Sequence, residues 1–385
     1  MHYIRLLRPP AVERGASRNQ LKLALTITTD LGDSYLSPQE PVELSVIGAY
    51  HDVDNSLKPV ILTRNATPRW RAGMRVLKFD LPLPSQPIQT IQIRPSSRQL
   101  TALGTTDVYP APDSKGLIVG VFADMPSSDE KPSPVCFRSL RIVGGDASAA
   151  VNALQVEEDF GDSIARHVWD GGIVTLSFIA NMCLNNIPSP TNPMPLFSGL
   201  LRQSNHHLDI IELGCGVGIV GIGLSRILRA AGLQADILMT DLPEAEERAQ
   251  ANILRYEEDV RSSEKPEANV EFESLDWQDG RNGVFGERAQ ASSWDVILVS
   301  ECTYNTDTLL ALVQTLSAIH ELSGRSAAPK DTKIFLATKP RHSSEREFFH
   351  MMAKERWTVA EQTRAPLPVL DGDDQSVEMY LFSRA

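Results

Sequence analysis

The stretch ELGCGVG at residues 212–218 decides the fold of this chain. It follows an apolar run, LDIIEL at 208–213, and precedes a helical run at 219–231. Glycines at the point where a strand turns into a helix let the backbone bend tightly and let a ligand lie against it. In open α/β sheets, ligands bind at the carboxyl ends of the strands. We therefore expect a ligand site at this turn.

Two classes of cofactor compete for this site. Gly216, Gly218 and Gly221 match the dinucleotide pattern G-x-G-x-x-G, which alone is a weak signal. A dinucleotide would place its pyrophosphate at the start of the helix. The carboxylate of Glu212 is unfavourable beside a pyrophosphate but suits a cation such as the sulfonium and amino group of S-adenosylmethionine (SAM). The turn therefore favours SAM over NAD.

Further apolar strands alternate with helical runs after this turn. Near-continuous apolar strands of this kind are typical of a parallel sheet buried on both faces. The expected strands are 235–240, 269–275, 294–300 and 333–338, and the expected helices are 173–184, 244–259, 306–322 and 343–356. Two last runs, at 357–361 and 377–382, are expected to form an antiparallel pair.

Polar and aromatic residues follow the second and third of these strands. Asp241 can accept hydrogen bonds from both ribose hydroxyl groups of a nucleoside ligand. It can equally cap the next helix, because Pro243 stands where a first helical turn can begin. After the third strand, Asp276 can accept from an adenine amino group and Trp277 can stack on the ring. A Trp that merely seals the sheet edge is the alternative.

The fourth strand ends in Ser300, Glu301, Cys302 and Tyr304. A carboxylate and a tyrosine at the top of a central strand stand where a substrate would meet the cofactor. Upstream, Trp169 precedes a helical run and is expected either to be a structural residue or to cover the cofactor.

The first 150 residues have a different character. Short β-type runs, several of them alternating, are separated by Pro, Gly, Asn, Asp and Ser clusters, which is typical of a sandwich or barrel. These runs are 21–29, 42–50, 60–63, 75–81, 88–93, 117–123 and 137–143, and 124–134 is expected to be a loop or linker. We expect a β-rich domain of unknown function at 1–150 and the α/β domain at 151–385.

Composition excludes several classes of protein. The 385 residues are 42% hydrophobic and 22% charged, as in an ordinary globular protein, and no run is long and apolar enough to span a membrane. The four cysteines show no zinc-ligand spacing, so neither a metal site nor a disulfide framework is expected. A reducing, cytoplasmic compartment is the simplest location.

The charge distribution bears on partners. Residues 151–385 carry 20 Lys and Arg against 35 Asp and Glu, a balance of −15. This acidity argues against nucleic-acid binding, which needs cations to neutralise phosphates. Acidic residues of the helix at 244–259 either attract a basic substrate or form an ordinary solvated face.

Five motifs in order resemble the class I, seven-strand SAM-dependent methyltransferases, and within them the protein-lysine methyltransferase-like group called methyltransferase family 16. The motifs are VWDGG (168–172), ELGCGVG (212–218), TDL (240–242), LDW (275–277) and WDVILVSECTYN (294–305). The resemblance covers roughly residues 151–385. It implies a Rossmann-like, mostly parallel seven-strand sheet with an antiparallel last strand.

The resemblance also implies a site and an activity. The expected cofactor-binding residues are Trp169, Glu212, Gly214, Cys215, Gly216, Asp241, Leu242, Asp276, Trp277 and Ser300, and the expected catalytic residues are Glu301 and Tyr304. The family's usual D-x-x-Y motif is Glu301-Cys302-Thr303-Tyr304 here, so the carboxylate is one methylene longer. The implied reaction transfers a methyl group from SAM to a lysine of a protein, such as a translation factor or a chaperone, and leaves S-adenosylhomocysteine (SAH).

Three alternatives remain at this point. One is a small-molecule methyltransferase of the same fold, although the extra N-terminal domain favours a macromolecular substrate. Another is a catalytically silent SAM-binding scaffold, motivated by the Glu-for-Asp difference at position 301. The third is an NAD-dependent oxidoreductase, for which we see no hydride-transfer constellation.

Overall fold

The structure is a computed structural model. It describes the whole chain except residues 16–17, 53, 66, 111–115, 127–132, 143–152, 161–163, 186–190, 203–206, 261–267, 327–328 and 385. Most of the expected 124–134 linker and the expected domain boundary at residue 150 lie outside the described residues.

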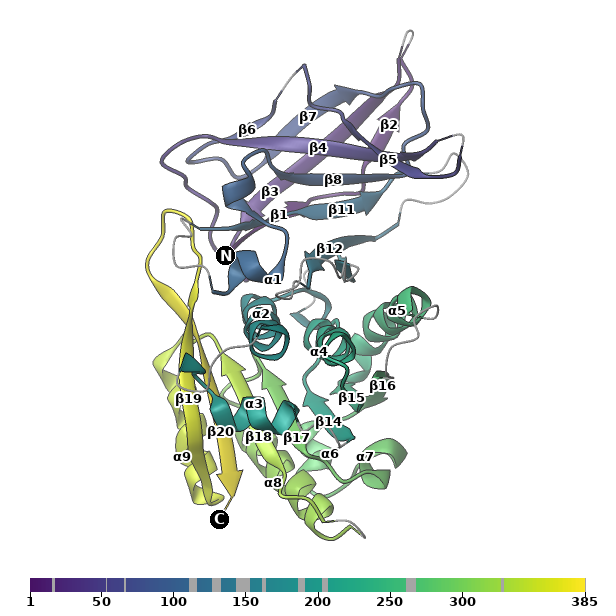
Figure 1. The fold of residues 1–385 in the computed structure, drawn as a ribbon. Helices are drawn as coiled ribbons and strands as arrows, with labels where there is room; N and C mark the ends of the chain where they lie inside the picture. The colour runs from purple at the N-terminus through teal and green to yellow at the C-terminus, as the bar shows by residue number, and fades with distance from the viewer. Residues whose placement is uncertain are drawn as a thin grey trace.

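The N-terminal part is a β-sandwich of two sheets (Figure 1). One sheet has the order β2-β3-β1-β10-β9, with β7 paired to β3. The other has the order β13-β12-β11-β8-β4-β5, with β6 paired to β4. The strands are β1 (His2–Leu6), β2 (Ala11–Glu13), β3 (Gln20–Thr28), β4 (Val42–His51), β5 (Leu57–Ile61), β6 (Arg69–Trp70), β7 (Leu77–Pro82), β8 (Thr90–Pro95), β9 (Thr101–Ala102), β10 (Ile118–Val119), β11 (Val121–Asp124), β12 (Val135–Arg141) and β13 (Ala153–Asp159).

All seven expected β-type runs of this part overlap observed strands, and its only described α-helix is the single turn α1 (Thr105–Val108). Strand β13 pairs with β12 along its whole length. The N-terminal sheet therefore extends beyond the boundary expected at residue 150.

The second part is a seven-strand sheet in the order β16-β15-β14-β17-β18-β20-β19. Its strands are β14 (Leu208–Leu213), β15 (Ala235–Asp241), β16 (Ala268–Ser274), β17 (Val296–Ser300), β18 (Lys333–Thr338), β19 (Trp357–Leu367) and β20 (Gln375–Arg384). The first five strands are mutually parallel, and β20 is antiparallel to both β18 and β19. This is the Rossmann-like sheet that the sequence predicts, with the expected antiparallel pair at its end.

Helices cover both faces of this sheet (Figure 1). Side chains of α2 (Asp170–Leu184), α3 (Pro195–Leu201), α4 (Ile219–Ala230) and α5 (Pro243–Val260) pack in one hydrophobic cluster with one face. Those of α6 (Trp277–Gly280), α7 (Glu287–Ala291), α8 (Leu309–Gly324) and α9 (Glu347–Lys354) pack in a second cluster with the other. No described helix combines the length and hydropathy that a membrane span requires.

The two parts share buried surface. The cluster on the α2 side continues into the N-terminal sandwich, where it includes Tyr3, Val119 and Val156. The second contact is made by the tip of the β19–β20 hairpin, which reaches the sandwich (Figure 1). Leu370, in this hairpin, belongs to the sandwich core. The N-terminal part is therefore packed onto the α/β part at two places.

Candidate functional site

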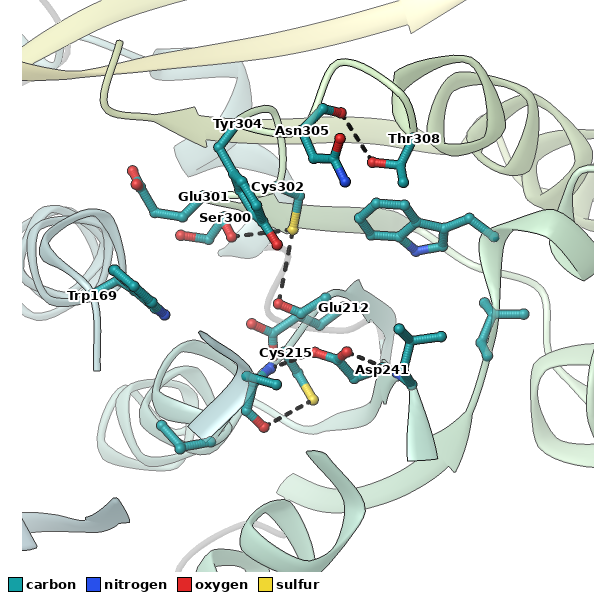
Figure 2. Close-up of a pocket in the computed structure, with 18 of the residues that line it drawn as sticks. Trp169, Glu212, Cys215, Asp241, Ser300, Glu301, Cys302, Tyr304, Asn305 and Thr308 are labelled. Atoms are coloured by element: carbon teal, nitrogen blue, oxygen red, sulfur yellow. Dashed lines mark hydrogen bonds between the residues drawn. The ribbon is translucent and has the colours of Figure 1, made fainter. Parts of the chain in front are cut away.

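A cavity of about 440 Å³ opens at the carboxyl ends of β14, β15 and β17 (Figure 2). All twelve residues that the sequence predicts for the site line it: Trp169, Glu212, Gly214, Cys215, Gly216, Asp241, Leu242, Asp276, Trp277, Ser300, Glu301 and Tyr304. The parallel register brings them together because these strand ends meet at one edge of the sheet.

The glycine turn forms the floor of the cavity. Gly214 and Gly216 have φ values of +70° and +55°, in the left-handed region that residues with a β-carbon rarely adopt. A β-carbon at Gly214 would lie 2.4 Å from the Cys302 sulfur and 3.4 Å from Cζ2 of Trp277. This position therefore requires glycine both for its backbone conformation and for the space it leaves.

Asp241 holds this turn in place. The Gly216 amide donates to Oδ2 of Asp241 at 2.7 Å, and the Leu242 amide donates to Oδ1 at 2.7 Å. The helix α5 begins two residues later, at Pro243. The carboxylate thus binds the glycine turn of the neighbouring strand instead of capping the first turn of α5. Burial raises its pKa.

Glu212 is a buried carboxyl group beside the same turn. The residue is 1% exposed, and Oε2 makes no well-formed hydrogen bond within the described residues, although the Gly221 amide acts on the carboxyl group and partly offsets the effect of burial on its pKa. Burial raises its pKa to about 8. A buried oxygen without a partner costs free energy unless a ligand satisfies it. The position is therefore suited to a donor or a positive charge supplied by a ligand.

On the opposite side of the cavity, Asp276 and Trp277 open the short helix α6. Oδ1 of Asp276 accepts from the Gln278 amide at 2.8 Å, which makes Asp276 the N-cap of α6. The half-buried indole of Trp277 lines the cavity near Gly214. The cap fixes the start of α6, the helix that carries the indole.

Tyr304 and Glu301 follow β17 but face different ways. The Tyr304 ring, 52% exposed, projects into the cavity, whereas the Glu301 side chain points away from the Tyr304 hydroxyl (Figure 2). The Glu301 oxygens accept from the Lys339 amide at 2.7 Å and from Nη2 of Arg341 at 2.8 Å. Burial raises the pKa of Glu301 to about 7, partly offset by the Arg341 charge. Each oxygen of Glu301 thus accepts one hydrogen bond from the protein, and its expected role in holding the substrate amine stays a prediction.

The two cysteines of the site are packing residues. The Cys302 sulfur lies 3.3 Å from the carbonyl oxygens of Leu213 and Ser300, so it joins the ends of β14 and β17. Burial raises the pKa of the Cys302 and Cys215 thiols well above the ordinary range. Both are therefore thiols and not nucleophilic thiolates at neutral pH.

Sequence reasoning missed several residues of the site. His167, Asn305 and Thr308 line the cavity, and Lys339 and Arg341 lie behind Glu301. The position of Lys339 and Arg341, directly after the end of the parallel strand β18, is the one signal that the sequence carries for them.

Comparison with known families identifies the α/β part. Residues 149–355, more than half of the chain, match the family described as lysine methyltransferase. The chain belongs to the lysine methyltransferase family. It is thus a class I SAM-dependent methyltransferase, and the NAD-dependent alternative is set aside.

A relative in Schizosaccharomyces pombe, a UPF0665 family protein, is 22% identical over 356 residues, which cover 90% of this chain and 91% of the relative. Among solved structures, a SAM-dependent methyltransferase of Methanosarcina mazei is 12% identical with a TM-score of 0.33, and the match covers 49% of this chain and 97% of that one. TYW2 of M. jannaschii, solved with AdoMet, is 13% identical with a TM-score of 0.32, covering 60% of this chain and 83% of that one.

The residues of the cavity fit SAM. The glycine turn at Gly214 and Gly216 leaves room that a β-carbon would reduce, and the unpartnered Oε2 of Glu212 matches a cationic group. The carboxylate of Asp241, at the end of β15, and the indole of Trp277, just after the neighbouring strand β16, both line the cavity. Together they suit the ribose and the base of a nucleoside.

Proposed function

We propose that the protein transfers a methyl group from SAM to the side-chain amine of a lysine in a protein substrate. One observation carries the proposal. The described residues that line the cavity include five with carboxyl groups and no Lys or Arg. These are Glu212, Asp241, Glu244, Asp276 and Glu301. Such a lining suits a cationic cofactor and a basic substrate, and it disfavours phosphate-rich ligands.

The cofactor would be held by three groups of residues. The backbone of Gly214 and Gly216 would contact its amino-acid tail, with Glu212 paired to the amino group. The free lone pairs of Asp241 would accept from the ribose hydroxyl groups. Asp276 and Trp277 would bind the adenine, with Trp169, Cys215, Leu242 and Ser300 completing the walls.

When bound, SAM supplies an electrophilic methyl group, so the protein mainly has to align the attacking nitrogen with it. A lysine side chain is protonated at neutral pH and must lose a proton before it can attack. Contact with the ring of Tyr304 removes water from the amine, which favours its neutral form. The Tyr304 hydroxyl can then accept a hydrogen bond from the amine and orient its lone pair.

The mouth of the cavity supports a macromolecular substrate. Tyr304 and Leu242 are 52% and 39% exposed, so the apolar wall continues onto the surface. A substrate side chain can reach the site from outside while the rest of the substrate stays on the protein surface. Of the acidic side chains of α5, only Glu244 lines the cavity, whereas Glu247 is paired with Arg166 and Arg248.

The first test is calorimetric titration of the full chain with SAM, SAH and NAD. We expect SAM and SAH to bind, NAD not to bind, and Trp277→Ala to lose cofactor affinity by roughly tenfold, because stacking on an aromatic side chain contributes about 1–3 kcal/mol per base. Val284→Ala is the control, since Val284 is exposed and lies outside the cavity lining. Absence of SAM and SAH binding would contradict the proposal.

The second test identifies the product. Tritiated SAM is incubated with the protein and a heat-treated lysate, and the labelled protein is hydrolysed to amino acids. Label in methyl-lysine supports the proposal. Label only in small molecules indicates a small-molecule methyltransferase, and cofactor binding without transfer to either fraction indicates a silent scaffold.

A further inference from the structure

A buried ionic cluster connects the N-terminal sandwich to the wall of the cavity. It consists of Asp30, Asp170, Glu301, Lys339 and Arg341, whose side chains are between 0% and 17% exposed. Nη2 of Arg341 donates to Asp30 Oδ2 and to Glu301 Oε2, each at 2.8 Å. Nζ of Lys339 donates to Asp170 Oδ2 at 2.7 Å and to Asp30 Oδ1 at 3.2 Å. Among these five side chains, Asp30 is the one that belongs to the N-terminal part, which also supplies the Met1 amino group and the Tyr3 hydroxyl, each donating to Asp170 at 2.9 Å.

Asp30 is itself fixed on several sides. Nη2 of Arg5 donates to its carbonyl oxygen at 2.6 Å, and the Leu31 amide donates to Oδ1 at 3.0 Å. The amide of Asp170, the first residue of α2, donates to Oδ2 at 3.3 Å. Although burial raises it, the bonds to Arg341 and the charge of Lys339 hold the pKa of Asp30 well below its usual range. The sandwich therefore presents a rigidly held, ionised carboxylate to Arg341.

The other side of the cluster faces the cavity. The Arg341 guanidinium carbon lies 5.9 Å from the centroid of the Trp169 ring. Glu301, its second partner, begins the loop that carries Tyr304, and all three of Trp169, Glu301 and Tyr304 line the cavity. A shift of Arg341 would therefore be transmitted to two separate walls of the site.

The backbone at Glu301 shows why this support is needed. Glu301 has a φ of +59°, a conformation that costs a non-glycine residue on the order of 1–3 kcal/mol and persists only when its surroundings hold it. The holding contacts are the Lys339 amide and the Arg341 guanidinium on the side chain. Arg341 in turn takes its orientation from Asp30.

We propose that Asp30 is a positioning residue of the methyl-transfer site, which acts through Arg341 to fix Glu301 and the loop that carries Tyr304. This inference rests on the proposed function. It means that the β-sandwich completes the catalytic site instead of only adding a surface beside it. Buried ion pairs are weak evidence of stabilisation in themselves, so the cluster supports a role of Asp30 in geometry more directly than a role in stability.

The test compares Asp30→Asn with Asp33→Asn in the full chain. Asp33 lies in the same turn but is exposed, and its side chain accepts a hydrogen bond from the Thr29 hydroxyl at 2.6 Å. The rate of tritium transfer from SAM to a heat-treated lysate is measured per SAH-binding site, so that unfolded molecules do not count. We expect Asp30→Asn to lower this rate on the order of tenfold or more, because small misplacements of reacting groups cost up to about a hundredfold.

Three further readouts separate positioning from a structural role. SAH affinity of Asp30→Asn should change far less than the transfer rate, because the glycine turn, Asp241 and Trp277 are untouched and only the Trp169 wall of the cofactor site adjoins Arg341. Hydrogen exchange of the 300–306 segment should increase in Asp30→Asn and not in Asp33→Asn. Arg341→Lys, which keeps the charge but loses the planar fork, should lower the rate likewise, and combining it with Asp30→Asn should add little further loss.

The outcomes are distinct. If the wild-type protein transfers the label and Asp30→Asn transfers it at the same rate, the inference is overturned and the proposed function stands. Absence of transfer by the wild-type protein contradicts the proposed function, and unchanged exchange at 300–306 then overturns the positioning as well. Should Asp30→Asn fail to fold, Arg341→Lys decides: a full rate and unchanged exchange in that variant overturn the inference.

Discussion

A β-carbon at Gly171 would lie 2.1 Å from Oε1 of Glu301, so these two residues fit together only because position 171 has no side chain. Gly171 belongs to the first turn of α2, and Glu301 follows β17. The contact places the Glu301 carboxyl group between the start of α2 and the Lys339 amide. The position of the loop that carries Tyr304 therefore depends on Gly171, which lies 130 positions before Glu301 in the chain.

Gly171→Ala should displace Glu301 and lower methyl transfer. Alanine favours a helix by about 1 kcal/mol over glycine, so a loss cannot come from helix propensity. Overpacking at this contact should instead cost about 1–3 kcal/mol in the free energy of unfolding. Gly199→Ala is the matched control, because Gly199 is also helical and a β-carbon there meets nothing within 4 Å. Urea unfolding and the transfer rate measure both effects, and equal behaviour of the two variants would contradict this account.

The sequence allows residues at the strand ends to be predicted, but not contacts that depend on how the two parts of the chain pack together. The strand ends at Gly214, Asp241 and Trp277 could be predicted, because strand periodicity and parallel order bring them to one edge. The partners of Glu301 could not, because Asp30 and Arg341 are 311 positions apart and meet only through the packing of the sandwich on α2. The direction in which the Glu301 side chain points depends on that packing, so the sequence predicted its place in the lining but not its partners.

Gly214→Ala should abolish cofactor binding as well as destabilise the fold. The variant combines a positive φ with a β-carbon 2.4 Å from the Cys302 sulfur. Gly232→Ala isolates the backbone cost, since Gly232 has a φ of +76° and open space around a β-carbon. We expect the control to lose about 1–2 kcal/mol of stability and to keep SAH affinity. SAH affinity in Gly214→Ala equal to that of the control would show that the turn does not contact the cofactor.

Tyr304→Phe should keep SAH affinity and lose methyl transfer. The variant retains the ring that lines the cavity and removes only the hydroxyl that we propose orients the lysine amine. The expected loss is about tenfold or more in the transfer rate at saturating SAM. Tyr35→Phe, at an exposed tyrosine of the sandwich, is the control. An undiminished rate in Tyr304→Phe would remove the hydroxyl from the mechanism and leave Tyr304 as a wall of the site.

Leu370→Ala should loosen the contact between the β19–β20 hairpin and the sandwich. Leu370 is 9% exposed and belongs to the sandwich core, and its neighbour Pro368 accepts a backbone hydrogen bond from Leu117 at 2.9 Å. Removing a buried leucine side chain typically costs about 2–5 kcal/mol. Leu57→Ala makes the same change at a leucine that is 58% exposed and should cost little. Equal urea midpoints for the two variants would mean that the hairpin tip contributes nothing to the stability of the fold.

Glu212 should make both stability and cofactor binding depend on pH. Burial raises its pKa to about 8, whereas in the unfolded chain a glutamate titrates near about 4.3. Between these values the folded protein without cofactor binds more protons than the unfolded chain, so its stability should fall as pH rises through this window. Binding of SAH should show the opposite trend, because its cationic amino group favours the ionised carboxylate. SAH affinity should therefore rise between about pH 6 and about pH 8.

Glu212→Gln removes the titrating group while keeping its size. The stability of this variant is measured by thermal unfolding without cofactor, and its SAH affinity by calorimetry, each at several pH values. Both quantities should depend less on pH in the variant than in the wild-type protein within this window. Asp241 and the Cys215 thiol also titrate near the turn, and burial raises the pKa of each, so the difference between wild type and variant is the relevant quantity. Glu246→Gln, on the exposed face of α5, should leave both profiles unchanged. If Glu212→Gln retains the wild-type slope of SAH affinity with pH, the amino group of the cofactor is held by another residue, and Asp241 is then the carboxylate to examine because it borders the same glycine turn.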